Sequence, residues 1–163
     1  MPQVREVEIR QEARFVLWAL RCAVLRSYGN SDAEAELARG FELARVSETL
    51  SQFWSLASAL ISVDWSPAVW HEPWCCCASN EELIILQAMA ESAERLRGEQ
   101  AEPAWRWRTI VPATSVGLID AMARSWIAAL DRAGVMFPRS AELVQSLRPL
   151  ENITQPAGMA RLH

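Results

Sequence analysis

The chain has 163 residues, of which 51% are hydrophobic and 22% charged, and its formal net charge at pH 7 is −4. A chain of this length buries roughly 70% of the surface that its unfolded form exposes, so the composition predicts one folded domain and argues against a disordered chain. The acidic balance is opposite to the basic surface of nucleic-acid-binding domains, so we expect no nucleic-acid partner.

The apolar pattern does not predict a membrane protein. The longest nearly apolar stretch covers residues 15–25 and contains Arg21, whereas a bilayer span needs about 20 apolar residues. The N-terminal residues mix acidic and basic side chains without the order of a signal peptide. We therefore expect a cytoplasmic protein with no membrane contact. All 16 basic residues are arginine, which is typical of GC-rich coding sequences and favours a bacterial source.

The first predicted helix covers residues 4–28, where no proline or glycine occurs. Its apolar side chains recur at three- and four-residue steps and so share one face. Gly29 ends this helix. Ser31 and Glu34 then have the spacing of a capping box, which predicts the start of a second helix over residues 32–63.

The periodicity of the second predicted helix slips between Ala44 and Leu50. We therefore expect a kink near Gly40 or Ser47. Prolines interrupt the pattern after this helix, so residues 64–78 are expected to form an ordered but irregular connection.

Three further helices are predicted, over residues 80–97, 115–133 and 139–148. Ser79 and Glu82 repeat the capping box before the first of them, and its wide apolar arc predicts a central position in the bundle. The second has the most regular apolar stripe, and the third is short. The predicted fold is all-α: a helical bundle of four main helices and a short fifth, in a single domain over residues 1–163.

The segment from His71 to Cys77 brings soft metal ligands and thiols together. In an extended backbone His71, Cys75 and Cys77 share one side and offer a nitrogen and two sulfur atoms to zinc or another soft metal, although a fourth ligand is missing. A cysteine just before a helix N-terminus is also a candidate reactive thiol, because the helix dipole favours the thiolate.

A structural role for these cysteines is the interpretation that we favour, since cysteine is a small and often buried residue. We expect at least two of Cys75, Cys76 and Cys77 to be largely buried, Ser79 to cap the following helix, and no cofactor to be bound. The chain lacks the nucleotide-binding, hydrolase and metalloprotease motifs, so we assign no catalytic residue.

Eight tryptophans against one tyrosine are the main oddity of the composition. Five of them lie in predicted connections, and four of these are candidates for contact with a ligand or partner: Trp70, Trp74, Trp105 and Trp107. The last two alternate with arginines, a pattern that also suits a stacking platform for nucleic acid. The acidic net charge favours the other interpretation, in which these tryptophans anchor a loop and the arginines face solvent or acidic groups.

The string His71-x-Pro73-x-Cys75-x-Cys77-x-Ser79-x-x-Glu82, followed by an apolar helix, resembles a pattern in small uncharacterised helical proteins of alphaproteobacteria. The string covers only a short part of the chain. Because that family has no assigned activity, the resemblance implies a bacterial cytoplasmic protein and gives no residue a functional role.

The function expected from the sequence is that of a non-enzymatic helical module which acts through protein–protein interaction or self-association, for example as a homodimer. Apolar stripes on the main helices, and more tryptophan than one small core requires, support this expectation. The alternative is a sensor of a small ligand, a metal or redox state, whose pocket is formed by the tryptophan-rich connections and the His71–Cys77 segment.

Overall fold

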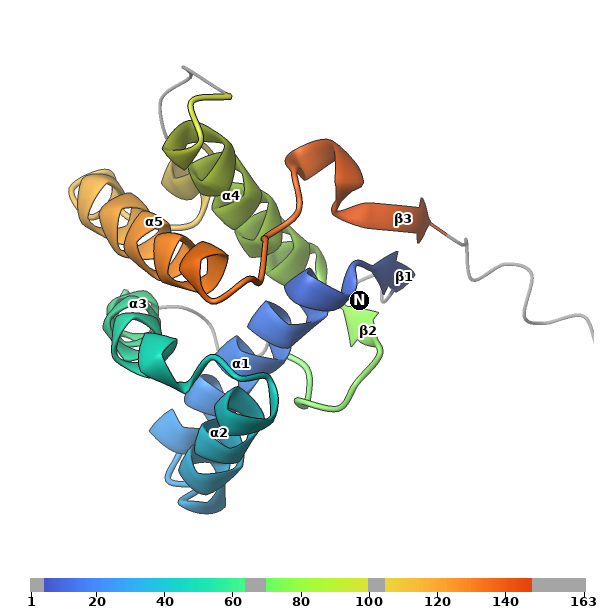
Figure 1. Ribbon diagram of the computed structural model, residues 1–163, viewed down its shortest axis with the longest axis vertical. Helices are drawn as coiled ribbons and strands as arrows, with labels where there is room; N and C mark the ends of the chain where they lie inside the picture. Colours follow the sequence, from blue (N-terminus) through green and yellow to red (C-terminus); the bar gives the residue numbers. More distant parts are fainter. Residues whose placement is uncertain (1–4, 64–69, 100–104, 148–163) are drawn as a thin grey trace, which may run out of the picture.

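The computed structural model describes residues 5–63, 70–99 and 105–147 (Figure 1). Five α-helices make up most of this part of the chain: α1 (Gln11–Ser27), α2 (Asp32–Leu43), α3 (Leu50–Ser62), α4 (Asn80–Leu96) and α5 (Val116–Arg132). The shorter elements are three 3-10 helices, η1 (Ser47–Thr49), η3 (Trp105–Thr109) and η4 (Ser140–Glu142), and three strands, β1 (Arg5–Ile9), β2 (Cys77–Ala78) and β3 (Val144–Leu147). The prediction of an all-α domain is confirmed.

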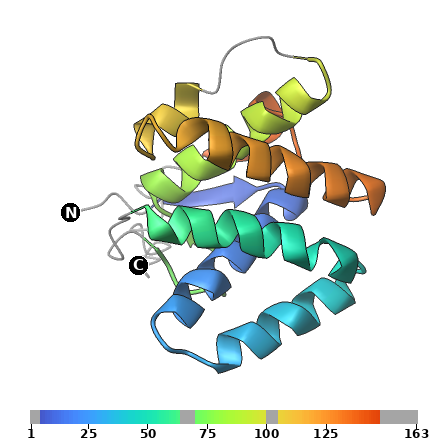
Figure 2. The ribbon, with the colours of Figure 1, turned by 90° about the vertical axis from the view of Figure 1, so that its left-hand side faces the viewer.

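The helices form a bundle in which α1 and α5 make most of the contacts (Figures 1 and 2). Helix α2 packs against α1, whereas α3 and α4 both pack against α5, and α1 also contacts α3 and α4. The strands form a small antiparallel sheet in the order β2-β1-β3, which the sequence pattern did not predict. Because β1 leads into α1 and β2 into α4, the sheet lies beside the N-terminal ends of both helices (Figure 1). In the described part of the chain, no helix is both long and apolar enough to cross a membrane.

Two segments that were predicted to be helical each contain a strand. The predicted helix over residues 4–28 begins as β1, and α1 starts only at Gln11. The predicted helix over residues 139–148 is wrong, because this segment forms η4 and then β3, which pairs with β1. A short apolar run has the same appearance in a helix and in a strand, and the distant partner that decides between them is not visible in local periodicity.

The predicted helix over residues 32–63 is divided into α2 and α3. Arg45 has a left-handed backbone conformation with φ of 58°, and the Val46 N–H donates to the Phe41 carbonyl at 2.9 Å. This hydrogen bond is that of a Schellman helix end, in which glycine usually takes the left-handed position. Gly29 takes that position after α1. Because an arginine takes it after α2, the break had no sequence signal beyond the slip in periodicity.

Aromatic side chains fill the core between α2, α3 and α5. Phe41, Phe53 and Trp126 are fully buried, and the ring centroids of Phe53 and Trp126 lie 4.9 Å apart in an edge-to-face arrangement. The Trp126 indole N–H donates to the Thr49 hydroxyl at 3.2 Å. The donor that every buried tryptophan must satisfy therefore has its partner in η1.

The contact between α1 and α2 depends on Gly40, because a Cβ atom at this position would clash with the Trp18 indole. We expect Gly40→Ala to lower the free energy of unfolding by about 1–3 kcal/mol, the usual cost of overpacking, as measured by urea denaturation. Gly117→Ala is the matched control, since Gly117 also lies in a helix and a Cβ atom added there would meet nothing within 4 Å. The control should be neutral or stabilise by up to about 1 kcal/mol. Equal effects of the two substitutions would contradict this account of the α1–α2 contact.

Candidate functional site

An exposed tryptophan lies at the tip of a tight turn between α3 and α4. Residues Glu72 to Cys75 form the turn, and the Cys75 N–H closes it by donating to the Glu72 carbonyl at 3.0 Å. Pro73 occupies the second position, where its fixed φ favours a turn, and it is buried. Trp74 occupies the third position and is 73% exposed. The turn therefore holds a large, mainly apolar side chain in solvent.

The guanidinium of Arg21, on α1, holds the backbone of this segment, which we call the 71–77 loop. Arg21 is 2% exposed, and its terminal nitrogens donate to the carbonyl oxygens of Glu72 (3.4 Å), Cys75 (2.8 Å) and Cys77 (2.6 Å). Its remaining donors bind the two carboxylate oxygens of Glu82 at 2.7 and 2.8 Å. All five N–H groups of the guanidinium thus have partners, and the loop is attached to α1 and α4 together.

Glu82, in the first turn of α4, is the anionic half of this buried pair and is 1% exposed. Its carboxylate also accepts from the backbone N–H groups of His71 at 3.0 Å and Ser79 at 2.8 Å. The Glu82 N–H in turn donates to the Ser79 hydroxyl at 3.1 Å. This reciprocal arrangement is the predicted capping box, and Ser79 is confirmed as the N-cap of α4.

The environment of Glu82 has opposite effects on its pKa. Burial raises the pKa of a carboxyl group because it disfavours the charged form. The hydrogen bonds from Arg21 and from the Ser79 and His71 backbone N–H groups outweigh burial and lower the pKa of Glu82 below its ordinary value of 4.5. Glu82 is therefore ionised at neutral pH, and its contact with Arg21 is an ion pair.

His71 lies at the edge of this network with a side chain that is 22% exposed. Because an ionised carboxylate only accepts hydrogen bonds, the His71 Nδ1 carries a proton and donates to Glu82 at 3.0 Å. A metal would have to bind at Nε2. Among the described residues, no three histidine, cysteine, aspartate or glutamate side chains are grouped so that they could hold a metal ion. The structure thus does not assemble His71, Cys75 and Cys77 into a metal centre.

The expectation that at least two of the three adjacent cysteines are largely buried is wrong. Cys76 is exposed, and Cys75 and Cys77 are half-buried. Arg21 binds the carbonyl oxygens of Cys75 and Cys77, which does not require their side chains to be buried. Burial, and then the neighbouring Cys75 and Cys76 thiols, raise the pKa of Cys77 to about 11. Burial likewise raises the pKa of Cys22 to about 12. The thiols of Cys22 and Cys77 are therefore protonated at neutral pH, which makes them poor nucleophiles.

The four candidate contact tryptophans differ in their surroundings. Trp74 is exposed at the tip of the turn. Trp107 is fully buried and its indole N–H donates to the Ser92 hydroxyl at 2.9 Å, so it anchors η3 to α4 and offers no surface to a partner. Trp107 is therefore not exposed for contact with a ligand or partner, contrary to the prediction. The side chain of Trp105 lies outside the described residues, and Trp70 is half-buried.

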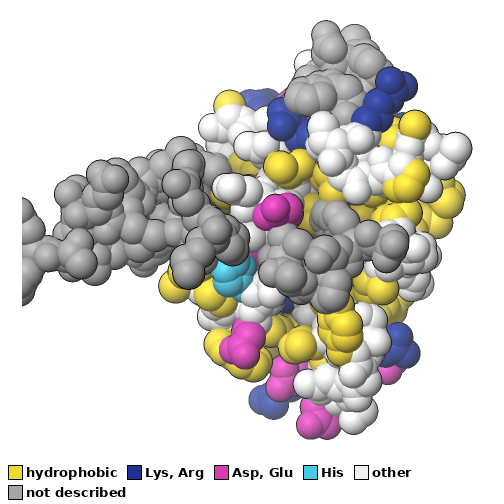
Figure 3. Space-filling view, turned by 180° about the vertical axis from the view of Figure 1, so that it is seen from behind, with side chains coloured by type: hydrophobic (Ala, Val, Ile, Leu, Met, Phe, Trp, Pro, Cys, Tyr) yellow, Lys and Arg dark blue, Asp and Glu magenta, His cyan; other side chains and the backbone are white. Residues whose placement is uncertain are grey.

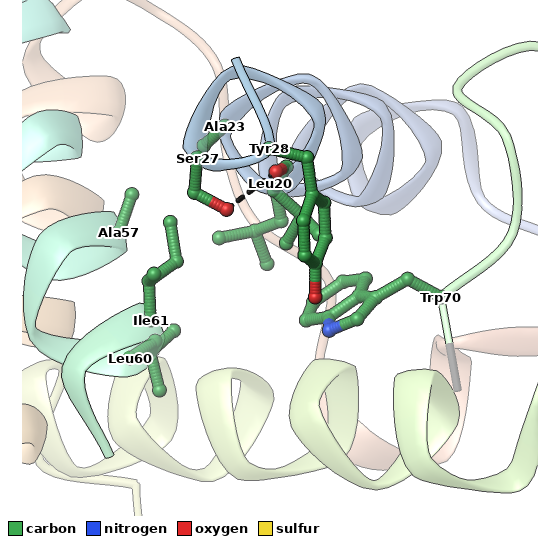
Figure 4. A pocket seen from close by; sticks show the side chains of 9 residues that line it. Leu20, Ala23, Ser27, Tyr28, Ala57, Leu60, Ile61 and Trp70 are labelled. Carbon is green, nitrogen blue, oxygen red and sulfur yellow. Dashed lines mark hydrogen bonds between the residues drawn. The ribbon is translucent and has the colours of Figure 1, made fainter. Parts of the chain in front are cut away.

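Trp70 borders a small cavity between α1 and α3 (Figure 4). The walls are mainly aliphatic, with Leu20 and Ala23 from α1 and Leu60 from α3, while Tyr28 and Trp70 lie on the side away from α3 (Figure 4). The cavity measures about 60 Å³. Its size is far below the roughly 300–1,000 Å³ of sites that hold a drug-sized ligand.

Arg21 is a site residue that sequence reasoning missed. A single arginine within an apolar stretch is a signal for a buried ion pair, because arginine is almost never fully buried unless it has a partner. Local spacing offers no means of choosing that partner, since Glu82 lies 61 residues further along the chain.

Comparisons with known proteins assign this chain to no family. No protein-family model, no curated protein and no solved structure matches the chain. The class that the fold and the site define is a small all-α domain in which a buried ion pair holds a loop with an exposed tryptophan.

Removing Arg21 tests the importance of the buried pair. We expect Arg21→Met to lower the free energy of unfolding by about 3–5 kcal/mol, because the Glu82 carboxylate stays buried without its counter-ion, as measured by urea denaturation. Arg26→Met is the matched control on the same helix: Arg26 pairs with Glu34, and the two side chains are 47% and 56% exposed. The Arg26 guanidinium also lies over the Trp54 ring, 4.7 Å from its centroid, so loss of both exposed contacts should cost at most about 2 kcal/mol. A similar cost for both substitutions would contradict the role given to Arg21.

The lowered pKa of Glu82 predicts a pH dependence of stability. Since its pKa is lower in the folded chain than the ordinary 4.5, its contribution is complete above about pH 4.5 and is lost as the pH falls through the folded value. Glu82→Gln should therefore have a lower free energy of unfolding than the wild type at pH 7. This difference between the two proteins should become smaller below about pH 4.5. Chemical denaturation at a series of pH values measures the free energy of unfolding of both proteins.

Glu99→Gln provides the control for this experiment. Its hydrogen bond with Arg139 also lowers the pKa of Glu99, but this pair lies on the surface. About 1 M salt should screen the exposed pair and remove the effect of Glu99→Gln on the free energy of unfolding. The effect of Glu82→Gln on the free energy of unfolding should persist in the same salt. A Glu82→Gln effect that also disappears in salt would show that the ion pair is solvated.

Proposed function

We propose that this chain is a non-enzymatic helical module that binds another protein through its 71–77 loop, with Trp74 as the anchoring side chain. The observation that carries the proposal is an indole that is 73% exposed on a turn whose carbonyl groups are bound by Arg21. Exposing a large apolar side chain to water is unfavourable. Tryptophan is also enriched among the few residues that supply most of the binding energy in protein interfaces.

The fixed backbone of the loop supports a binding role. Ordering a flexible loop upon association reduces affinity, because the loop loses conformational freedom. Here Arg21 and Glu82 order the loop before any partner arrives, and both are buried. A tryptophan side chain has only two rotatable bonds, so its immobilisation costs little further entropy.

The structure gives less support to the alternative of a small-ligand or redox sensor. The cavity beside Trp70 measures about 60 Å³, which is too small for an ordinary metabolite. A redox-sensing cysteine usually has a lowered pKa, whereas the pKa values of Cys22 and Cys77 are raised. The exposed tryptophan therefore favours protein binding more strongly than the cavity or these thiols favour a sensor.

The setting that we propose for this interaction is the bacterial cytoplasm. The basic residues of the chain are all arginine, in keeping with GC-rich coding. The four cysteines are free, as is usual for proteins of a reducing compartment. Light scattering on the wild type and on Trp74→Ser distinguishes self-association as a homodimer from binding to a different protein.

Site-specific photo-crosslinking tests the proposal. With the photoreactive residue benzoylphenylalanine in place of Trp74 in the full chain, we expect a discrete crosslinked protein in bacterial cells, identified by mass spectrometry. The same residue in place of Leu118 is the control, because Leu118 is also largely exposed, at 58%, but lies on α5. The crosslink should form at position 74 and not at position 118.

The second part of this test is Trp74→Ser. An exposed side chain contributes little to folding, so the free energy of unfolding should change by about 0.5 kcal/mol or less. The protein found by crosslinking should no longer co-purify with this variant. Equal crosslinking at both positions, or undiminished co-purification with Trp74→Ser, would sink the proposal.

A further inference from the structure

The exposed charged side chains of the segment that carries Trp74 have one sign. Between residues 70 and 82 the chain contains no arginine or lysine, and both Glu72 and Glu81 are exposed. The guanidinium that contacts this segment belongs to Arg21, which is 2% exposed and paired with Glu82. The exposed charged side chains that flank Trp74 along the described chain are therefore acidic, and they contribute a negative potential.

Both acidic side chains are close to the tryptophan along the chain and on ordered backbone. Glu72 is the first residue of the turn that carries Trp74, and its carbonyl oxygen is bound by Arg21. Glu81 lies in the first turn of α4, just after the capping residue Ser79. On the face of the molecule seen in Figure 3, acidic side chains lie among hydrophobic ones. An apolar side chain with polar or charged groups near it is the usual arrangement of a protein interface.

The charge of this rim disfavours a second copy of the chain as the partner. In a twofold contact centred on Trp74, residues near the axis face their own copies. Glu72 of one protomer would then lie near Glu72 of the other. Like charges placed against each other across an interface oppose association.

On the basis of the proposed function, we infer that the partner of the 71–77 loop is a basic surface of a different protein, with an apolar recess that receives Trp74 and arginine or lysine side chains around it. The recess buries the indole, which provides most of the affinity. The basic rim faces Glu72 and Glu81, which speeds association and fixes the orientation of the two proteins.

Selection of random peptides displayed on phage tests this inference without knowledge of the partner. The full chain is the bait, and peptides that also bind Trp74→Ser are removed. The remaining, Trp74-dependent peptides should carry more arginine and lysine than the unselected library. A synthetic copy of a selected peptide should bind about twofold to fivefold more weakly to Glu72→Gln with Glu81→Gln, and more weakly at about 300 mM than at about 50 mM salt. Glu48→Gln, an exposed glutamate in η1, should leave the affinity unchanged.

The outcomes separate this inference from the proposed function. Trp74-dependent peptides that are neutral or acidic, or whose affinity does not respond to the glutamate substitutions, overturn the basic partner and leave the docking role of Trp74 intact. A failure to obtain any Trp74-dependent peptide overturns the docking role itself. Light scattering that shows a dimer in the wild type and a monomer in Trp74→Ser identifies a second copy as the occupant and also overturns the basic partner.

Discussion

The conformation of the loop before α4 depends on the ion pair between Arg21 and Glu82. One guanidinium joins α1 to the N-terminus of α4 and to three carbonyl oxygens of the 71–77 loop. Since this loop continues directly into β2, which pairs with β1, the position of the pair is also linked to the sheet. Burying two charges is unfavourable unless the remaining hydrogen-bonding positions are filled. Here Arg21 uses every donor, and Glu82 is further bound by His71 and Ser79.

An apolar pair at these positions could be equally stable, because replacing a buried ion pair with hydrophobic residues is often neutral or stabilising. Apolar side chains would pack against the loop without fixing where its carbonyl groups point. A guanidinium has a rigid, planar set of donors, so the three carbonyl oxygens that Arg21 binds are held in defined positions around it. The ion pair specifies one conformation of the loop, and this is what determines the position of Trp74.

Local spacing predicted the start of α4 correctly but was wrong about the capping box at Ser31 and Glu34. The Ser31 side chain makes no capping hydrogen bond, and the Asn30 side chain accepts from the Asp32 and Ala33 N–H groups instead. Features formed where two distant segments meet were not predicted. The capping box at Ser79 and Glu82 lies within four residues, so its spacing alone predicted the start of α4. The division between α2 and α3 was visible only as a slip in periodicity, because Arg45 replaces the usual glycine. Strand β3 was taken for a helix because its partner β1 lies at the other end of the chain. Burial of at least two of the three cysteines is the expectation from the small, apolar character of cysteine. The prediction is wrong because hydrogen bonds from Arg21 to backbone carbonyl groups fix this loop.

The fold accounts for the backbone of the exposed turn but not for the side chain of Trp74. Pro73 sets the backbone of the second position, and the Cys75 N–H closes the turn. The third position of such a turn is well served by small polar residues such as serine, asparagine or glycine. A tryptophan that is 73% exposed adds no core contact that the turn requires and leaves a large apolar surface in water, which is unfavourable. Under the function that we propose, the reason for a tryptophan at this position is its contact with another protein.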